Sequence, residues 1–95
     1  MDEIISKSKF TFEMYKNINR VELFGSFSKG TQTINSDIDF LIYGDLSLVE
    51  ILTISVELER IFNRRVDIVI KDDLTSPILI KSIIESPNNV IIFKR

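Results

Sequence analysis

Residues 24–43 read FGSFSKGTQTINSDIDFLIY, and two acidic side chains within this stretch interrupt an otherwise apolar run. Asp37 and Asp39 are separated by a single residue and are followed by the apolar residues 40–42. Carboxylates are depleted in strands and are rarely fully buried without a partner. Positions i and i+2 of a strand point to the same face, roughly 6.5 Å apart, and two carboxylates at that spacing can share bound metal ions. We therefore expect a strand over residues 37–43 with a metal site on its acidic face.

The residues that precede this strand predict a second strand and a connecting turn. Residues 20–24 have the pattern of a short strand that ends at Gly25. Residues 26–30 are expected to form a tight turn or a short helical turn, and residues 31–36 are mostly polar and indicate a loop. Residues 2–17 fit both a helical face and an alternating strand pattern. We expect a helix there, because a polar break separates this segment from the strand that follows.

The residues after the acidic strand predict a helix and a third strand. Ser47 followed by Glu50 is a capping-box pattern, and the spacing of apolar residues predicts a helix from there to about residue 62. Asn63 is a typical helix stop. The apolar run at 66–70 predicts a strand, and it carries a single acidic residue, Asp67.

The last third of the chain predicts one more helix and one more strand. Ser76 before Pro77 is typical of a helix start, with the helix running to about Glu85, and residues 90–93 predict the strand. The apolar side chains of this helix cover more than one stripe, so part of it is either core or a partner surface. Residues 1–95 are thus expected to form a single α/β (α+β) domain. Its small mixed sheet has about four strands, with helices packed mainly on one face and the site on the open face.

Composition narrows the function. A chain of 95 residues has little material for a second, substrate-binding lobe, so we expect another molecule to complete the acceptor site. A net charge of −2 argues against direct nucleic-acid binding. With no Cys and no His, a bound metal would be a hard cation held by oxygen, such as Mg²⁺. No signal peptide and no apolar run of about 20 residues is present, so we expect no membrane contact and a cytoplasmic location.

The acidic residues suit phosphoryl or nucleotidyl transfer. This chemistry needs a phosphate whose charge is neutralised, an in-line nucleophile and a stabilised leaving group. Asp37 and Asp39 could hold two Mg²⁺ ions roughly 3.5–4 Å apart, with Asp67 on a neighbouring strand as a third ligand. An ionised Asp could also accept the proton of the attacking hydroxyl.

The Gly25-Ser26 turn supplies groups for the phosphates. A glycine lets the backbone approach a phosphate closely, the Ser26 hydroxyl can donate to the phosphate oxygens, and Lys29 adds a positive charge. A Gly-Ser pair or an Asp-x-Asp pair alone is a weak signal. Their joint spacing, with a third acid inside an apolar strand, favours a nucleotidyl-transfer site.

The run LFGSFSKGTQTINSDIDFLIY, residues 23–43, resembles the nucleotidyltransferase superfamily typified by DNA polymerase beta. The pattern of that superfamily is Gly-Ser, a spacer, Asp-x-Asp, and a third carboxylate on a later strand. Here ten residues separate Ser26 from Asp37, and Asp67 stands in RRVDIVI. More narrowly, the chain resembles the minimal nucleotidyltransferases (MNT) that pair with HEPN proteins in prokaryotic toxin–antitoxin systems. The similarity covers nearly all of the chain except its N-terminal segment.

This resemblance implies a Mg²⁺-dependent antitoxin that transfers AMP from ATP to a tyrosine hydroxyl of a HEPN ribonuclease and so blocks it. It also implies the roles of five residues. Gly25 and Ser26 would bind the triphosphate, and Asp37, Asp39 and Asp67 would bind Mg²⁺.

Several alternatives remain open at this level. Lys29 stands where arginine is frequent in the family, and it is either a phosphate ligand or a solvated loop lysine. Arg64 and Arg65 form either a solvated corner or a basic pair that steers ATP. The alternative function is a non-catalytic antitoxin that neutralises the toxin by binding alone. Transfer to a small molecule or to RNA is weaker, because no residues remain for an acceptor domain.

Overall fold

A computed structural model of the chain describes residues 2–72 and 77–95. The last helix begins at Pro77 as predicted, whereas the predicted cap residue Ser76 lies outside the described residues. No helix in the described ranges is both long and apolar enough to cross a membrane. The elements in chain order are α1 (Asp2–Glu13), β1 (Ile18–Phe24), α2 (Ser26–Lys29), β2 (Ile38–Gly44), α3 (Leu48–Phe62), β3 (Val66–Lys71), α4 (Pro77–Ile84) and β4 (Val90–Lys94).

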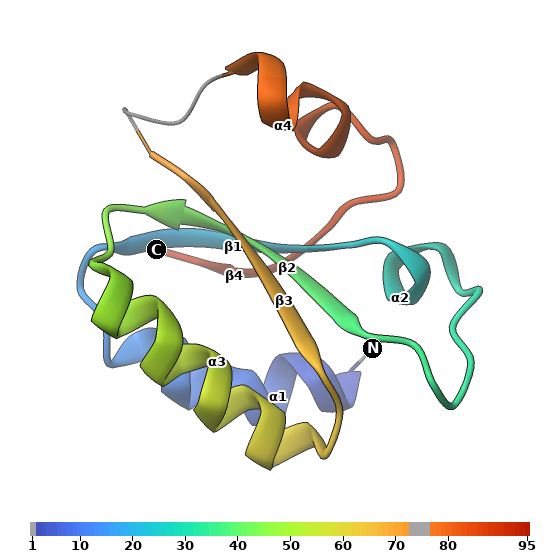
Figure 1. Cartoon of the computed structure of the whole chain (residues 1–95), viewed down its shortest axis with the longest axis horizontal. Coiled ribbons are helices and arrows are strands. Elements are labelled where there is room, and N and C mark those ends of the chain that lie inside the picture. The colour runs from blue at the N-terminus through green and yellow to red at the C-terminus, as the bar shows by residue number, and fades with distance from the viewer. Residues whose placement is uncertain (1, 73–76) are drawn as a thin grey trace.

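The four strands form one mixed sheet in the order β3-β2-β1-β4. β1 pairs antiparallel with β2 and with β4, and β2 pairs in parallel with β3. The parallel pair is joined by α3, since parallel neighbours need a long crossover, usually a helix. Figure 1 shows α1 and α3 on one side of the sheet and α4 on the other. The predicted α/β fold is confirmed, and α4 is the helix that does not join the main helical layer.

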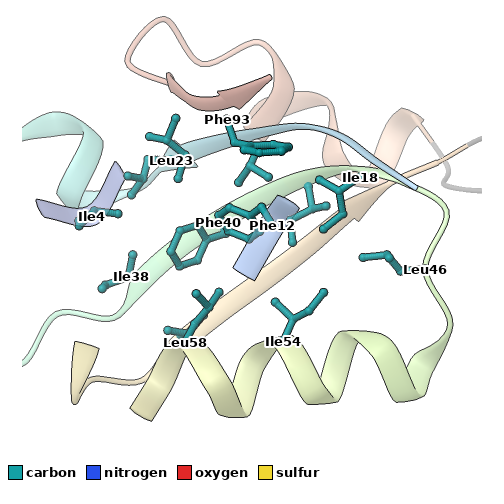
Figure 2. Close-up of a cluster of buried hydrophobic side chains, with 14 residues drawn as sticks. Ile4, Phe12, Ile18, Leu23, Ile38, Phe40, Leu46, Ile54, Leu58 and Phe93 are labelled. Atoms are coloured by element: carbon teal, nitrogen blue, oxygen red, sulfur yellow. The ribbon is translucent and has the colours of Figure 1, made fainter. Parts of the chain in front are cut away.

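The core lies between the sheet and the layer formed by α1 and α3 (Figure 2). Ile38, Phe40 and Ile42 alternate along β2 and are buried there. The ring of Phe12 from α1 meets the ring of Phe40 edge-on, with the centroids 5.7 Å apart. Because side chains alternate along a strand, burial of this face turns Asp39 to the opposite face of the sheet.

The predicted start and stop signals of α3 are both present. The N–H of Glu50 donates to the Ser47 hydroxyl at 3.1 Å, and the N–H of Ser47 donates to the Glu50 carboxylate at 2.9 Å. These bonds satisfy two backbone donors that a helix start leaves free. Asn63 takes the left-handed conformation after the last turn, with a φ of 51°. The length of α3 therefore sets where β3 begins.

Candidate active site

The centre of the site is the pairing of Asp39 with Asp67. The parallel register of β2 and β3 sets these residues side by side, so both side chains leave the sheet on the face opposite α1 and α3. Asp39 is half-buried and Asp67 is exposed. Burial raises the pKa of Asp39 to about 6, with further contributions from the charge of Asp67, a hydrogen bond with it, and the charge of Asp37. A proton or a cation at this point would relieve the repulsion between the two carboxylates.

Gly25 lies against the carboxylate of Asp39. The antiparallel register pairs Phe24 with Asp39, which brings the end of β1 to this point of β2. A Cβ built on Gly25 would run into Oδ2 of Asp39 and would lie 3.0 Å from its Cγ. The backbone of Gly25 also has a φ of 74° and a ψ of −150°, a region that is essentially restricted to glycine. Only glycine fits both requirements.

The turn after Gly25 is the short helix α2, which is the second of the two predicted forms, a tight turn or a short helical turn. The carbonyl of Gly25 accepts the N–H of Lys29 at 3.2 Å and the Ser28 hydroxyl at 2.9 Å. Gly30 ends the turn in the left-handed conformation. Ser26 is half-buried at the start of α2, and the Lys29 side chain is exposed. The structure therefore brings the Gly25-Ser26 turn to Asp39 and leaves Lys29 in solvent.

Asp37 lies one residue before β2 and contacts a basic side chain. Its Oδ1 accepts a hydrogen bond from Nε of Arg65 at 3.2 Å, and the Arg65 side chain is 81% exposed. Within residues 2–72 and 77–95, no three His, Cys, Asp or Glu side chains are placed to hold one metal ion together. Of the three predicted ligands, Asp39 and Asp67 meet, whereas Asp37 is paired with Arg65.

The donors at the site suit a hard divalent cation. Asp39 and Asp67 offer only carboxylate oxygen, the ligand type that Mg²⁺ prefers. Burial raises the pKa of Asp39, and the negative charges of Asp67 and Asp37 raise it further, so a bound cation would stabilise the ionised form. This electrostatic condition and the chemistry of the donors agree with the predicted metal.

The family model described as "Polymerase beta, Nucleotidyltransferase" matches residues 6–95. The chain belongs to this nucleotidyltransferase family. The predicted resemblance to the nucleotidyltransferase superfamily is thereby confirmed.

Two curated relatives come from Methanocaldococcus jannaschii. The nucleotidyltransferase is 32% identical over 85 residues to "Putative protein adenylyltransferase MJ0126", a match that covers 87% of each chain. It is 34% identical over 87 residues to "Putative protein adenylyltransferase MJ1379", again covering 87% of each.

Solved structures share the fold. The nucleotidyltransferase superposes on a chain of a crystal structure of a toxin–antitoxin with AMP-PNP, with a TM-score of 0.75 and 24% identity, covering 99% of this chain and 73% of that one. A second match is a chain from the tri-AMPylated Shewanella oneidensis HEPN toxin in complex with its MNT antitoxin. Its TM-score is 0.70 at 16% identity, covering 100% of this chain and 74% of that one.

Arg64 of the nucleotidyltransferase has contacts that the sequence did not predict. Its Nη1 donates to the carbonyl oxygens of Thr33 and Ile34, both at 3.1 Å, and of Ser36 at 2.9 Å. Its guanidinium carbon lies 5.0 Å from the centroid of the Phe27 ring. The acceptors precede Arg64 by 28 to 31 residues, and no residue spacing signals a bond to a loop carbonyl. Arg64 lies at the predicted corner between α3 and β3, where it is half-buried and bonded to the loop, whereas Arg65 is exposed.

Proposed function

We propose that this nucleotidyltransferase transfers AMP from ATP to a tyrosine hydroxyl of a HEPN-type partner protein and acts as an antitoxin. Relatives that are named as protein adenylyltransferases support the reaction class. Toxin–antitoxin complexes among the structures that share its fold support the type of partner.

One juxtaposition supports this function most directly. Asp39 and Asp67 lie side by side, and the turn that begins at Gly25 abuts the carboxylate of Asp39. A group that binds the triphosphate is thus next to groups that bind cations. Nucleotidyl transfer requires this proximity, because the charge on the phosphates must be neutralised where the bond breaks.

Two Mg²⁺ ions would be held by Asp39 and Asp67, with Asp37 as the further ligand once Arg65 releases it. When bound, the ions neutralise the charge of the triphosphate and make the acceptor hydroxyl more acidic. The Arg65 side chain is 81% exposed, so it can leave Asp37 without disturbing the core.

Different residues of the chain have different roles in the proposed reaction. The acceptor oxygen attacks the α-phosphorus of ATP, the bond from that phosphorus to the bridging oxygen breaks, and pyrophosphate leaves. Asp67 is exposed, so it can orient the partner's hydroxyl and accept its proton. Gly25 and Ser26 hold the leaving pyrophosphate through backbone N–H groups and the Ser26 hydroxyl. Lys29 supplies charge at the rim of this turn.

The partner completes the acceptor side of the site. We propose that residues 1–95 act as one MNT domain and that the tyrosine and its surroundings come from the HEPN protein. Since ATP is the AMP donor, we expect the reaction to take place in the cytoplasm. The activity on a protein rather than on RNA agrees with the net charge of −2.

The proposal is tested by mass spectrometry of the partner. The chain is incubated with a HEPN-type protein, ATP and Mg²⁺, and the mass of the HEPN protein is measured. We expect a gain of one or more AMP units on tyrosine, dependent on Mg²⁺. Asp39→Asn should abolish the gain. Asp45→Asn, at an exposed position just after β2, is the matched control and should leave it intact.

Two outcomes would contradict the proposal. Inhibition of the HEPN protein without any mass gain would indicate an antitoxin that acts by binding alone. AMP transfer that survives Asp39→Asn would show that the paired carboxylates are not the catalytic groups.

A further inference from the structure

Arg64 contacts the residues next to both parts of the sequence motif, although it belongs to neither part. Phe27, which its guanidinium faces, is the second residue of α2 and follows Ser26 directly. Ser36, whose carbonyl oxygen it binds at 2.9 Å, precedes Asp37 directly. One side chain therefore links the turn that begins at Gly25 to the start of the acidic strand.

The loop between these parts has little other support. Residues 31–35 are exposed, and the hydrogen bonds within the loop are local. The N–H of Ser36 donates to the Thr33 carbonyl at 3.1 Å, and the N–H of Thr33 donates to the Ser36 hydroxyl at 2.8 Å. These bonds fix the tip of the loop, and the N–H of Thr31 ties its start to the Ser26 carbonyl at 3.0 Å. None of these bonds ties the loop to α3 or β3. Arg64, at the corner between α3 and β3, provides such a tie.

Arginine suits this position for two physical reasons. Its guanidinium is planar, so its face can lie on an aromatic ring while its edge donates hydrogen bonds. The carbonyl oxygens of Thr33, Ile34 and Ser36 converge on one nitrogen, Nη1, and their partial negative charges favour a cation there. The half-buried position of Arg64 shields these bonds in part from competing water.

We propose that Arg64 is a positioning residue that holds Phe27, next to Ser26, and Ser36, next to Asp37, in one arrangement, and so sets where Asp37 lies relative to the Gly25-Ser26 turn. The role in transfer rests on the proposed function, whereas the clamp on the loop rests on the contacts alone. The pairing of β1 with β2 already places Gly25 against Asp39. Asp37 and the loop before it lie outside the strands, so the clamp selects the loop conformation in which Asp37 faces the site. Small misplacements of reacting groups cost about a hundredfold in rate.

The test compares Arg64→Ala and Arg64→Lys with Arg60→Ala. Arg60 lies one turn earlier in α3 and is exposed, so its loss is the matched control. Three quantities are measured: hydrogen exchange of the amides at 31–36, affinity for AMP-PNP with Mg²⁺, and the rate of AMP transfer to the HEPN protein.

For Arg64→Ala we expect faster amide exchange at 31–36 with no change in the exchange of β1 and β2. We also expect kcat for transfer to fall by about a hundredfold, with a much smaller change in AMP-PNP affinity, since the turn still binds the nucleotide but no longer aligns it. Arg64→Lys keeps the charge without the planar face. It should therefore keep part of the loop protection and recover only part of kcat.

The possible failures are distinguishable. Unchanged exchange at 31–36 in both Arg64 variants would refute the clamp, whether or not the protein is active. Faster exchange with an unchanged kcat would refute the role in positioning. A wild-type protein that transfers no AMP would refute the proposed function, and the exchange data would still decide whether Arg64 holds the loop. An Arg60→Ala variant with the same defects would show a general loss of stability.

Discussion

Gly25 and Asp39 can keep their present positions only while residue 25 has no side chain. A Cβ at Gly25 would overlap Oδ2 of Asp39, and the φ of 74° is unfavourable for any other residue. The close packing of Gly25 on Asp39 brings the turn after β1 against the acidic face of β2. Glycine is thus required here by a specific neighbour as well as by the backbone.

Gly25→Ala should displace the Asp39 carboxylate and strain the backbone. We expect the free energy of unfolding to fall by about 2–3 kcal/mol, measured by urea denaturation, together with weaker binding of Mg²⁺. Gly30→Ala is the matched control. Gly30 also has a positive φ, 73°, but a Cβ there would meet nothing within 4 Å. Gly30→Ala should therefore lower the free energy of unfolding by only about 1 kcal/mol. Equal losses at both positions would mean that the contact with Asp39 does not matter.

Asp39→Asn should stabilise the metal-free protein at neutral pH. The pKa of Asp39 is raised from 3.8 to about 6 in the folded state, so between these values the native protein keeps a proton that the unfolded chain has lost. The free energy of unfolding therefore falls as the pH rises from 3.8 to about 6. Above this range the ionised Asp39 destabilises the folded protein to its full extent. Asn carries no charge at any pH. In EDTA at pH 8 we expect a gain of about 1 kcal/mol after allowing for solvent screening.

The same substitution should have almost no effect on stability at pH 4, where the native carboxyl is protonated. Urea denaturation at the two pH values measures the difference, and Asp45→Asn serves as the exposed control. An identical effect of Asp39→Asn at both pH values would rule out the electrostatic origin.

Arg65→Gln should strengthen the binding of Mg²⁺ by the nucleotide-free protein. Nε of Arg65 lies 3.2 Å from Oδ1 of Asp37, so the guanidinium competes with a cation for this carboxylate. An exposed ion pair contributes up to about 1 kcal/mol, which corresponds to about a fivefold change in affinity. Isothermal titration at low salt measures it, and the gain should shrink at high salt. Unchanged or weaker binding would mean that Asp37 is not a ligand.

Glu22→Gln should destabilise the protein far more than Glu3→Gln. The Glu22 side chain is 4% exposed, forms an ion pair with Arg20, and accepts a bond from the Asn89 amide at 3.3 Å. The loss of its charge leaves a buried network incomplete, at a cost of about 1.5–3 kcal/mol. Glu3 pairs with Lys7 in solvent, so Glu3→Gln should lower the urea midpoint far less. Similar urea midpoints for the two variants would contradict this expectation.

Much of the site follows from sequence because it depends on local periodicity. The period of two in a strand places Asp39 on the face opposite Ile38 and Phe40, whereas Asp37, predicted on the same strand, lies one residue before it. A helix of the length of α3 between two apolar strands predicts a parallel crossover, so Asp67 arrives from the adjacent strand. The requirement for glycine at position 25 is consistent with its place at the end of a strand.

The remaining features depend on contacts between distant residues. A parallel strand can shift by two residues and keep the same faces, so the alignment of Asp67 with Asp39 is not contained in the pattern. The bonds from Arg64 to Thr33 and Ser36 require a particular loop conformation. The pairing of Arg65 with Asp37 removes one acid from the group that sequence spacing suggests. These contacts determine which of the three acidic side chains lie close together.

β3 lies at the edge of the sheet, and among the described strands it pairs only with β2. Each time this edge frays, Asp67 moves away from Asp39, and each time it closes, the two carboxylates are forced together again. Closure is therefore opposed by charge in the bare protein and would be favoured by a cation between the strands. The acidic residues that we assign to catalysis would then also determine how stably β3 pairs with β2 at the edge of the sheet.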